Sequence, residues 1–194
     1  DVARMALLLA GFSEKVPGIT VNRNCSSALD AVNIAAKTIL VGEGEITIGS
    51  GVESMSRAPW SMLKPDRVPT TIPPKMWDTT VGWRFNNPKM DQLYPIISLG
   101  EAAEVIAEEL QISREDQDQY ALKSHERAVT AINNRVFKDE IVPIKTNLKR
   151  GRSKLIEVDE HPRYEIAENK YNLAINIEDL SKLRPAFKKD GTVT

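Results

Sequence analysis

The single cysteine of the sequence, Cys25, lies where a nucleophile could act. It stands between an apolar segment expected to be a strand, residues 19–21, and a helix expected to begin at Ser26. A thiol at a helix N-terminus faces free backbone N–H groups and the positive end of the helix dipole, and both favour the nucleophilic thiolate. The small residues Ser27 and Ala28 would let the backbone approach a bulky thioester. The pattern is typical of turns that carry acyl-transfer nucleophiles, whereas a lone cysteine is commonly just a small buried apolar side chain.

Several stretches of the sequence resemble signatures of the thiolase family, enzymes that hold acyl groups as a thioester on a cysteine. The segment around Cys25 is similar to the family's nucleophile segment, and the other stretches follow in the family's order. Together they run through the whole chain, at residues 22–32, 51–59, 78–85, 137–143, 183–187 and 191–194. Two positions depart from the family pattern: Ala28 stands where glycine is usual, and Asp30 where glutamine is common.

The resemblance implies a reaction. Cys25 would attack the ketone carbonyl of a 3-ketoacyl-CoA, release acetyl-CoA, and hold the acyl group until a second CoA takes it. The Cys25 backbone N–H would help to stabilise the oxyanion. Coenzyme A would be a substrate, and neither a cofactor nor a metal ion is implied. Residues 82–85, Gly-Trp-Arg-Phe, favour the degradative 3-ketoacyl-CoA branch over acetoacetyl-CoA synthesis.

The family's other catalytic residues, a histidine in Gly-His-Pro and a second cysteine, do not occur in the sequence. His161 precedes Pro162 but follows Glu160 rather than glycine, so we do not expect it to be the base. We therefore interpret the chain as an internal portion of a thiolase or an incomplete chain, inactive alone. Two alternatives stay open: a non-catalytic thiolase-like polypeptide, and a lipid-carrier type of thiolase relative.

Three further positions match family positions along the CoA path. Arg163 would lie along the CoA nucleotide, where its guanidinium could pair with phosphate or stack on adenine. His125 would line the CoA channel, and Leu99 would lie over the pantetheine and acyl path. The alternatives are a surface arginine, a solvated helix face and an ordinary core leucine respectively.

The expected fold class is α/β, a partial thiolase-like layered αβα domain with an inserted, mostly helical loop domain. Residues 1–58 would belong to the N-terminal domain with the nucleophile, 59–183 to the inserted CoA-contacting domain, and 184–194 again to the N-terminal domain. The pattern predicts helices at 1–10, 26–41, 100–110 and 113–133, and strands at 19–21, 46–48, 141–144 and in the last residues. Residues 57–95 are too rich in proline for regular elements. The acidic run from Glu101 to Glu109 is interpreted as a solvated helix face.

Composition narrows the classes of partner. The 194 residues carry a net charge of −1 and are 41% hydrophobic, which does not favour nucleic acid or an anionic membrane as partner. No apolar run reaches the roughly 18 residues of a membrane-spanning helix. With one cysteine no intrachain disulfide can form, so we expect a reducing compartment: the cytoplasm, or an organellar matrix in a eukaryote. The resemblance implies a role in degrading fatty acids or related acyl-CoA compounds, as a homodimer or homotetramer.

Overall fold

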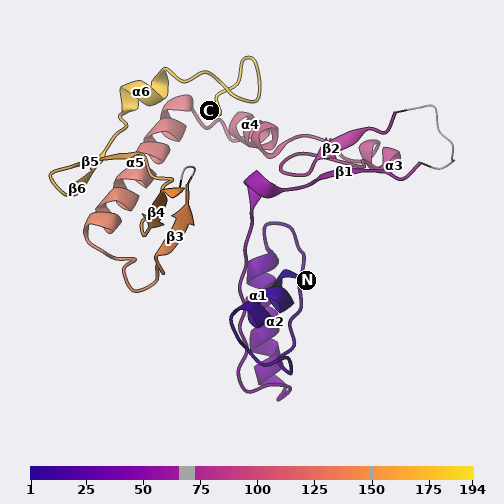
Figure 1. The fold of residues 1–194 in the computed structure, drawn as a ribbon. Coiled ribbons are helices and arrows are strands. Elements are labelled where there is room, and N and C mark those ends of the chain that lie inside the picture. The colour runs from indigo at the N-terminus through magenta and orange to yellow at the C-terminus, as the bar shows by residue number, and fades with distance from the viewer. Residues whose placement is uncertain (66–72, 149–150) are drawn as a thin grey trace. The chain divides into compact units, whose positions relative to one another are not determined.

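The computed structural model describes residues 1–65, 73–148 and 151–194 (Figure 1). The chain forms two compact units, Asp1–Arg84 and Phe85–Thr194, and each is described separately below. The predicted domains are a different division: residues 1–58 and 184–194 in the N-terminal domain, and residues 59–183 in the inserted domain. This division stays a prediction.

Two helices dominate the first unit: α1 (Val2–Leu9) and α2 (Ser27–Leu40). The side chain of Asp1 caps α1 by accepting a hydrogen bond from the Arg4 backbone N–H, as N-terminal caps do. Gly11 and Gly42 follow the two helices with φ of +84° and +76°, which glycine adopts without steric cost. Both helices lie where the sequence predicts them.

The sequence predicted two strands in this unit, at residues 19–21 and 46–48. This prediction is wrong, because the described structure forms no strand there. Both segments lie outside the helices and strands and have no hydrogen-bonded strand neighbour, and a strand exists only where a neighbour satisfies its backbone groups. Ile46 and Ile48, expected to be buried, are 89% and 71% exposed. The segment after them lies against α2 instead, because a Cβ added at Gly49 would be 2.7 Å from the Val32 Cα atom.

A β-hairpin completes the first unit, where the sequence predicted no regular elements. The short 3-10 helix η1 (Met55–Arg57) leads to β1 (Trp60–Met62), which pairs antiparallel with β2 (Met76–Asp78). The prolines do not prevent pairing because Pro59 lies before β1, and Pro65, Pro73 and Pro74 lie in the connection. A proline outside a strand removes no ladder hydrogen bond. Pro69 lies outside the described residues.

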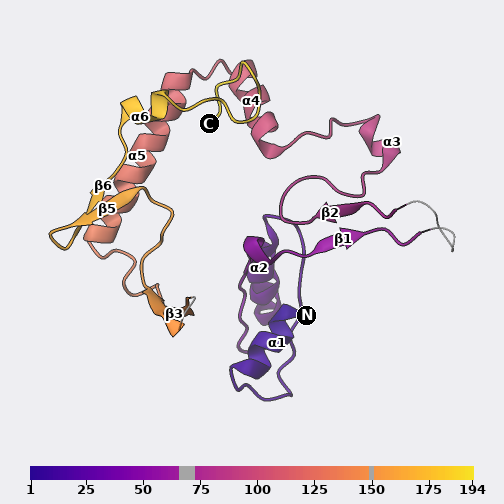
Figure 2. The same cartoon turned by 45° about the horizontal axis from the view of Figure 1, so that its top comes forward.

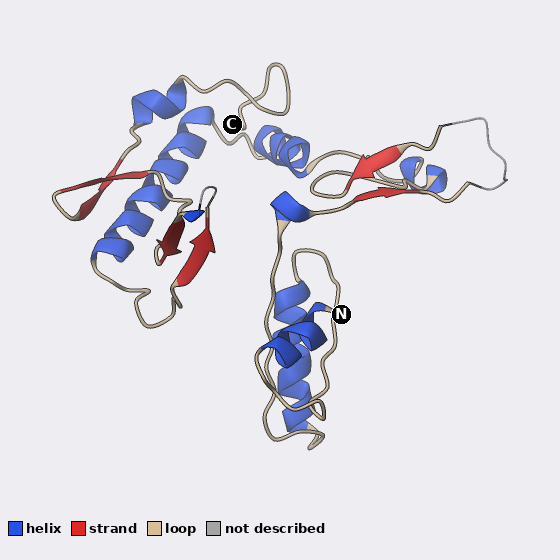
Figure 3. Cartoon of the chain, in the orientation of Figure 1, coloured by secondary structure: helices blue, strands red, loops and turns tan. Residues whose placement is uncertain are grey.

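The second unit combines helices with two β-hairpins (Figure 3). Each hairpin is an isolated antiparallel pair, β3 with β4 and β5 with β6. The strand predicted at residues 141–144 begins only at its last residue. In chain order the elements are α3 (Pro88–Asp91), α4 (Leu99–Glu109), α5 (Arg114–Asn133), β3 (Ile144–Asn147), β4 (Ser153–Ile156), β5 (Tyr164–Ala167), β6 (Lys170–Leu173) and α6 (Ile177–Ser181).

Helix α5 organises the second unit by packing against both β6 and α6 (Figures 1 and 2). Ser113 caps it by accepting a hydrogen bond from the Asp116 backbone N–H at 3.0 Å. Arg114 pairs with the buried Asp118 at 2.8 Å and donates to the Leu180 carbonyl of α6 at 2.5 Å. A buried carboxylate that is paired in this way fixes α6 on α5, because it would be costly to leave unpaired.

Glu104 of α4 is buried rather than solvated, which corrects the interpretation of the acidic run. Its carboxylate accepts hydrogen bonds from the backbone N–H groups of Thr192 and Val193, each at 2.9 Å. Gly191 makes this possible, since a Cβ there would be 2.0 Å from the Glu104 Oε1 atom. The strand predicted for the last residues does not form in the described structure, because this carboxylate takes up its backbone donors.

Little of the apolar surface is covered. Among the described residues the buried apolar side chains are Ala107, Val129 and Leu180, all in the second unit. Within the described ranges, no helix is both long enough and apolar enough to cross a membrane.

Candidate functional site

The turn that carries Cys25 is held by the residues on either side of it. The Asn24 backbone N–H donates to Asn22 Oδ1 at 2.9 Å, and the Ser27 hydroxyl donates to the Asn24 carbonyl at 2.6 Å. Asn24 has a φ of +49°, in the left-handed region that asparagine tolerates better than most residues. The backbone thus turns sharply just before the cysteine.

Cys25 itself is a free, exposed thiol one residue before Ser26, the N-cap of α2. Its placement at the start of this helix is as predicted from the sequence. The exposure argues against the alternative of a small buried structural cysteine. An exposed side chain in this position can meet a substrate.

The two departures from the thiolase pattern have structural explanations. Asp30 forms an ion pair with Arg23, with 3.0 Å between Asp30 Oδ2 and Arg23 Nε, so the first turn of α2 is tied to the turn before Cys25. Ala28 packs tightly: a Cβ added at Gly51 would be 2.6 Å from the Ala28 Cβ atom. This contact indicates that α2 is tightly packed at Ala28.

Two of the predicted CoA-contacting residues meet in the second unit. The Arg163 backbone N–H donates to His125 Nδ1 at 3.2 Å. His125 lies on α5 and is half-buried, while the Arg163 side chain is exposed just before β5. The His125 ring also stacks with that of His161, with 6.0 Å between centroids and 26° between planes. The sequence predicted both residues separately but not the bond between them.

Leu99 is the first residue of α4, after the N-cap Ser98. Its side chain is 82% exposed, so the alternative of an ordinary core leucine does not fit the described structure. Exposure at a helix start suits a residue that lies over a ligand. Leu99, His125 and Arg163 all belong to the second unit, whereas Cys25 belongs to the first.

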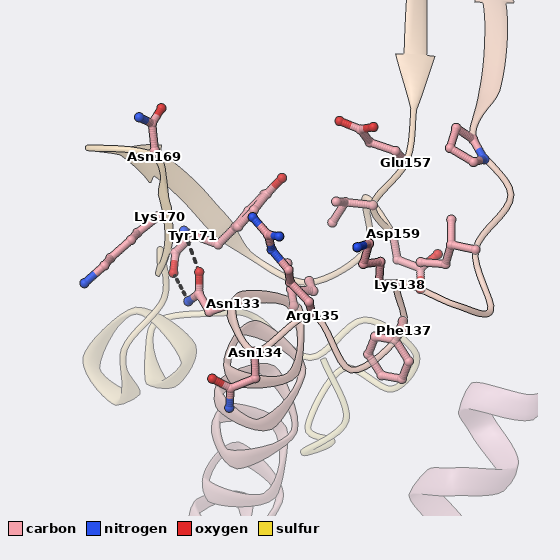
Figure 4. A pocket seen from close by; sticks show the side chains of 14 residues that line it. Asn133, Asn134, Arg135, Phe137, Lys138, Glu157, Asp159, Asn169, Lys170 and Tyr171 are labelled. Carbon is pink, nitrogen blue, oxygen red and sulfur yellow. Dashed lines mark hydrogen bonds between the residues drawn. The ribbon is translucent and has the colours of Figure 1, made fainter.

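A cavity of about 920 Å³ lies elsewhere in the second unit (Figure 4). It is bounded by the C-terminal end of α5, the turn that follows, residues 157–159 and the tip of the β5–β6 hairpin. Its charged lining residues are of both signs: Arg135, Lys138, Lys170, Glu157 and Asp159. Because these charges are scattered in the sequence among ordinary loop residues, sequence reasoning missed the cavity. None of the predicted site residues lines it.

The part of the chain that the structure describes holds no group of three or more His, Cys, Asp or Glu side chains placed to bind a metal ion. The predicted site residues are an exposed cysteine in the first unit, and a hydrogen-bonded histidine and arginine with an exposed leucine in the second. These groups suit acyl transfer to a thiol and recognition of an anionic ligand.

Comparison with known proteins agrees with this chemistry. The family described as "Thiolase, N-terminal domain" matches residues 1–194. The chain is 44% identical over 194 residues to a beta-ketoadipyl-CoA thiolase of Pseudomonas putida and to a 3-oxoadipyl-CoA/3-oxo-5,6-dehydrosuberyl-CoA thiolase of Escherichia coli K12. Each alignment covers 100% of this chain and 46% of the relative.

Among solved structures, the chain resembles the acetyl-CoA acetyltransferase of Bacillus anthracis with a TM-score of 0.81 and 38% sequence identity. The likeness covers 100% of this chain and 45% of that one, and it confirms the predicted fold class. The chain thus spans slightly less than half the length of the curated relatives it matches. By the match along its whole length, the chain belongs to the thiolase family, in the N-terminal domain of that fold.

Proposed function

We propose that the protein to which these residues belong is an acyl-CoA acyltransferase that cleaves 3-ketoacyl-CoA with coenzyme A. The observation that carries the proposal is the exposed Cys25 at the N-terminus of α2, in a chain that the thiolase family matches throughout. An exposed thiol in such a position can be acylated and deacylated.

In the first half-reaction the Cys25 thiolate attacks the C3 carbonyl carbon of the substrate. The C2–C3 bond then breaks, its electron pair passes to C2, and C2 takes up a proton to give acetyl-CoA. In the second, the thiolate of free CoA attacks the acyl-cysteine carbonyl and the Cys25 thiolate leaves. Both histidines of the sequence lie in the second unit, so the described part of the first unit offers no histidine to accept the thiol proton of Cys25 or to protonate C2.

The substrate class is a 3-ketoacyl-CoA from the degradation of fatty acids or related acyl-CoA compounds. Residues 82–85 support the degradative direction. Relatives are named for beta-ketoadipyl-CoA and 3-oxoadipyl-CoA, so a dicarboxylic acyl chain has to be tested beside a simple fatty acyl chain. We place the enzyme in the cytoplasm, or in an organellar matrix in a eukaryote, and expect a homodimer or homotetramer.

For coenzyme A itself, we propose that Arg163 lies along the nucleotide and Leu99 over the pantetheine. The exposure of both side chains supports these roles. An arginine fork suits a phosphate group, and an exposed leucine at a helix start gives an apolar surface for the pantetheine chain.

The test is to trap the acyl-enzyme. The active enzyme is incubated without free CoA, once with 3-ketoadipyl-CoA and once with a medium-chain 3-ketoacyl-CoA, and digested at low pH. We expect the mass of an acyl group on the peptide that contains Cys25, and none in the Cys25→Ala variant. Turnover that proceeds unchanged in Cys25→Ala would refute the proposal. Absence of both turnover and acylation in the wild type would favour the non-catalytic alternative.

A further inference from the structure

We propose that His125 is a positioning residue for CoA binding: it fixes the backbone of Arg163 and so aims the Arg163 side chain at the CoA nucleotide. This inference rests on the proposed function, in which Arg163 contacts CoA. It differs from a direct contact between His125 and the ligand, because here His125 acts only through the main chain of Arg163.

The backbone of Arg163 is held on both sides. Its N–H donates to His125 Nδ1 at 3.2 Å, and its carbonyl accepts from the Ala174 N–H at 3.0 Å, which extends the β5–β6 pairing by one step. The guanidinium, in contrast, forms no ion pair with any described residue. The backbone of Arg163 is thus fixed while its guanidinium stays exposed, and this arrangement suits a residue that binds an anionic ligand.

Helix α5 provides a rigid base for this arrangement. Asn133, eight positions after His125, exchanges two hydrogen bonds with the backbone of Tyr171 in β6, at 2.7 Å and 3.0 Å. Eight residues span about 12 Å of helix, so the hairpin region is fastened to α5 at two separated points. His125 is one of these two points, and its loss would leave the Arg163 backbone held only by the hydrogen bond from the Ala174 N–H.

The protonation state of His125 decides whether the fastening exists. To accept at Nδ1, the neutral ring must carry its proton at Nε2. Burial, followed by the charges of His161 and Arg163, lowers the pKa of His125 from its ordinary value of 6.5. Those two are the charged groups that act on His125 among the described residues. Below the lowered pKa a second N–H would face the Arg163 N–H, and the hydrogen bond would be lost.

The experiment compares two substitutions of His125 in the active enzyme. His125→Leu removes the acceptor, and we expect KM for CoA to rise roughly 2- to 10-fold, the worth of one hydrogen bond, with kcat unchanged. His125→Asn places an acceptor oxygen where Nδ1 was, so we expect KM to return toward the wild-type value. Equal KM values in His125→Leu and the wild type would overturn the inference, as would failure of asparagine to restore KM in a variant that melts like the wild type.

Arg163→Ala separates this inference from the proposed CoA contact. If Arg163 binds CoA, Arg163→Ala raises KM for CoA roughly 5- to 30-fold, and adding His125→Leu raises it no further. Arg152→Ala, an exposed arginine between β3 and β4, is the matched control and should leave KM unchanged. If Arg163→Ala leaves KM for CoA unchanged, the proposed CoA contact is refuted. If Arg163→Ala raises KM but His125→Leu does not, only the role of His125 is refuted.

The pH profile gives a readout that a purely structural role would not show. In the wild type, KM for CoA should rise as the pH falls below 6.5 through the lowered pKa of His125. The CoA 3′-phosphate also titrates near pH 6, so the comparison with His125→Asn is essential, since that variant keeps only the ligand's titration. Identical profiles for the two proteins would contradict the inference.

Discussion

Asn24 prepares the position of Cys25 by adopting a left-handed backbone conformation, with a φ of +49°. Asparagine suits this region because its short polar side chain tolerates it, whereas a branched residue is strained there. The adjacent Asn22 stabilises the same turn by accepting the Asn24 N–H. At the scale of the residue, therefore, the reactive thiol depends on backbone geometry one position before it.

We predict that Asn24→Gly keeps the stability of the protein and Asn24→Val lowers it by about 1–2 kcal/mol, the cost of a left-handed conformation for a residue that resists it. Thermal unfolding of the two variants beside the wild type measures the difference. The glycine variant is the control for loss of the asparagine side chain. Equal melting of the valine and glycine variants would show that the turn does not hold this conformation.

Cys25 is predicted to react with iodoacetamide at neutral pH faster than the cysteine of an unstructured peptide. The prediction follows from the position of Cys25 directly before the N-cap of α2, and the exposed side chain leaves the thiol accessible to the reagent. Mass spectrometry of timed samples gives the rate, and the same protein unfolded in urea is the control. A rate no greater in the folded protein than in urea would count against a thiol activated by the helix.

At the scale of the element, polar side chains fasten neighbouring segments where apolar packing is sparse. Glu104 holds residues 192–193 on α4, Arg114 holds α6 on α5, and Asn133 holds β6 on α5. Each bond joins a helix side chain to a backbone group of another segment. Such bonds direct the approach of two elements more strictly than apolar contact does, because they have fixed donors and acceptors.

Glu104→Ala is predicted to lower the melting temperature, because two backbone N–H groups would lose their acceptor. The control is Glu109→Ala, an exposed position of the same helix, which should have little effect. Equal melting of the two variants would show that Glu104 is not needed to hold residues 192–193.

The same carboxylate should make stability depend on pH. The backbone N–H of Thr192 is the main cause of the lowered pKa of Glu104, with Val193 and Lys188 adding to it. Since the folded pKa is lowered, the contribution is fully present above the ordinary value of 4.5 and is lost as the pH falls through the folded value. The Glu104→Ala variant should therefore show a weaker loss of stability in acid than the wild type.

At the scale of the whole molecule, the uncovered apolar surface is the main feature. Among the described residues, the buried apolar side chains are Ala107, Val129 and Leu180. Large side chains such as Leu9, Leu40 and Trp60 are more than two-thirds exposed. Surface of this kind needs cover, from further polypeptide or from other copies.

The 194-residue polypeptide by itself is predicted to bind the dye ANS strongly and to associate as its concentration rises. Fluorescence titration and light scattering after size exclusion measure the two effects. A full-length thiolase of known structure, whose apolar faces are covered, is the comparison. A monomer that melts in one cooperative step and does not increase ANS fluorescence would contradict the prediction. It would show that the core is more complete than the exposed side chains indicate.

The sequence by itself determined the family, the place of Cys25 before a helix, and the helices α1, α2, α4 and α5; it did not predict α6, and α3 lies where no regular element was predicted. Cys25 is marked by the residues around it, and the bounds of α1, α2, α4 and α5 follow from local caps and periodicity, which act over a few neighbouring positions. Ser113 as N-cap and Gly42 as the end of α2 are examples in which the deciding hydrogen bonds are local. The matched family signatures likewise need only the order of residues along the chain.

Only the tertiary structure decided which distant groups meet. The strands predicted at residues 19–21 and 46–48 fail because strand formation depends on a neighbour, which local pattern cannot supply. The buried role of Glu104 depends on residues 192–193, and the bond from Arg163 to His125 joins positions 38 apart. The local sequence around an acidic helix residue or a polar loop does not show whether its polar groups face solvent or bind a distant segment. Long-range packing alone decides between solvent exposure and burial.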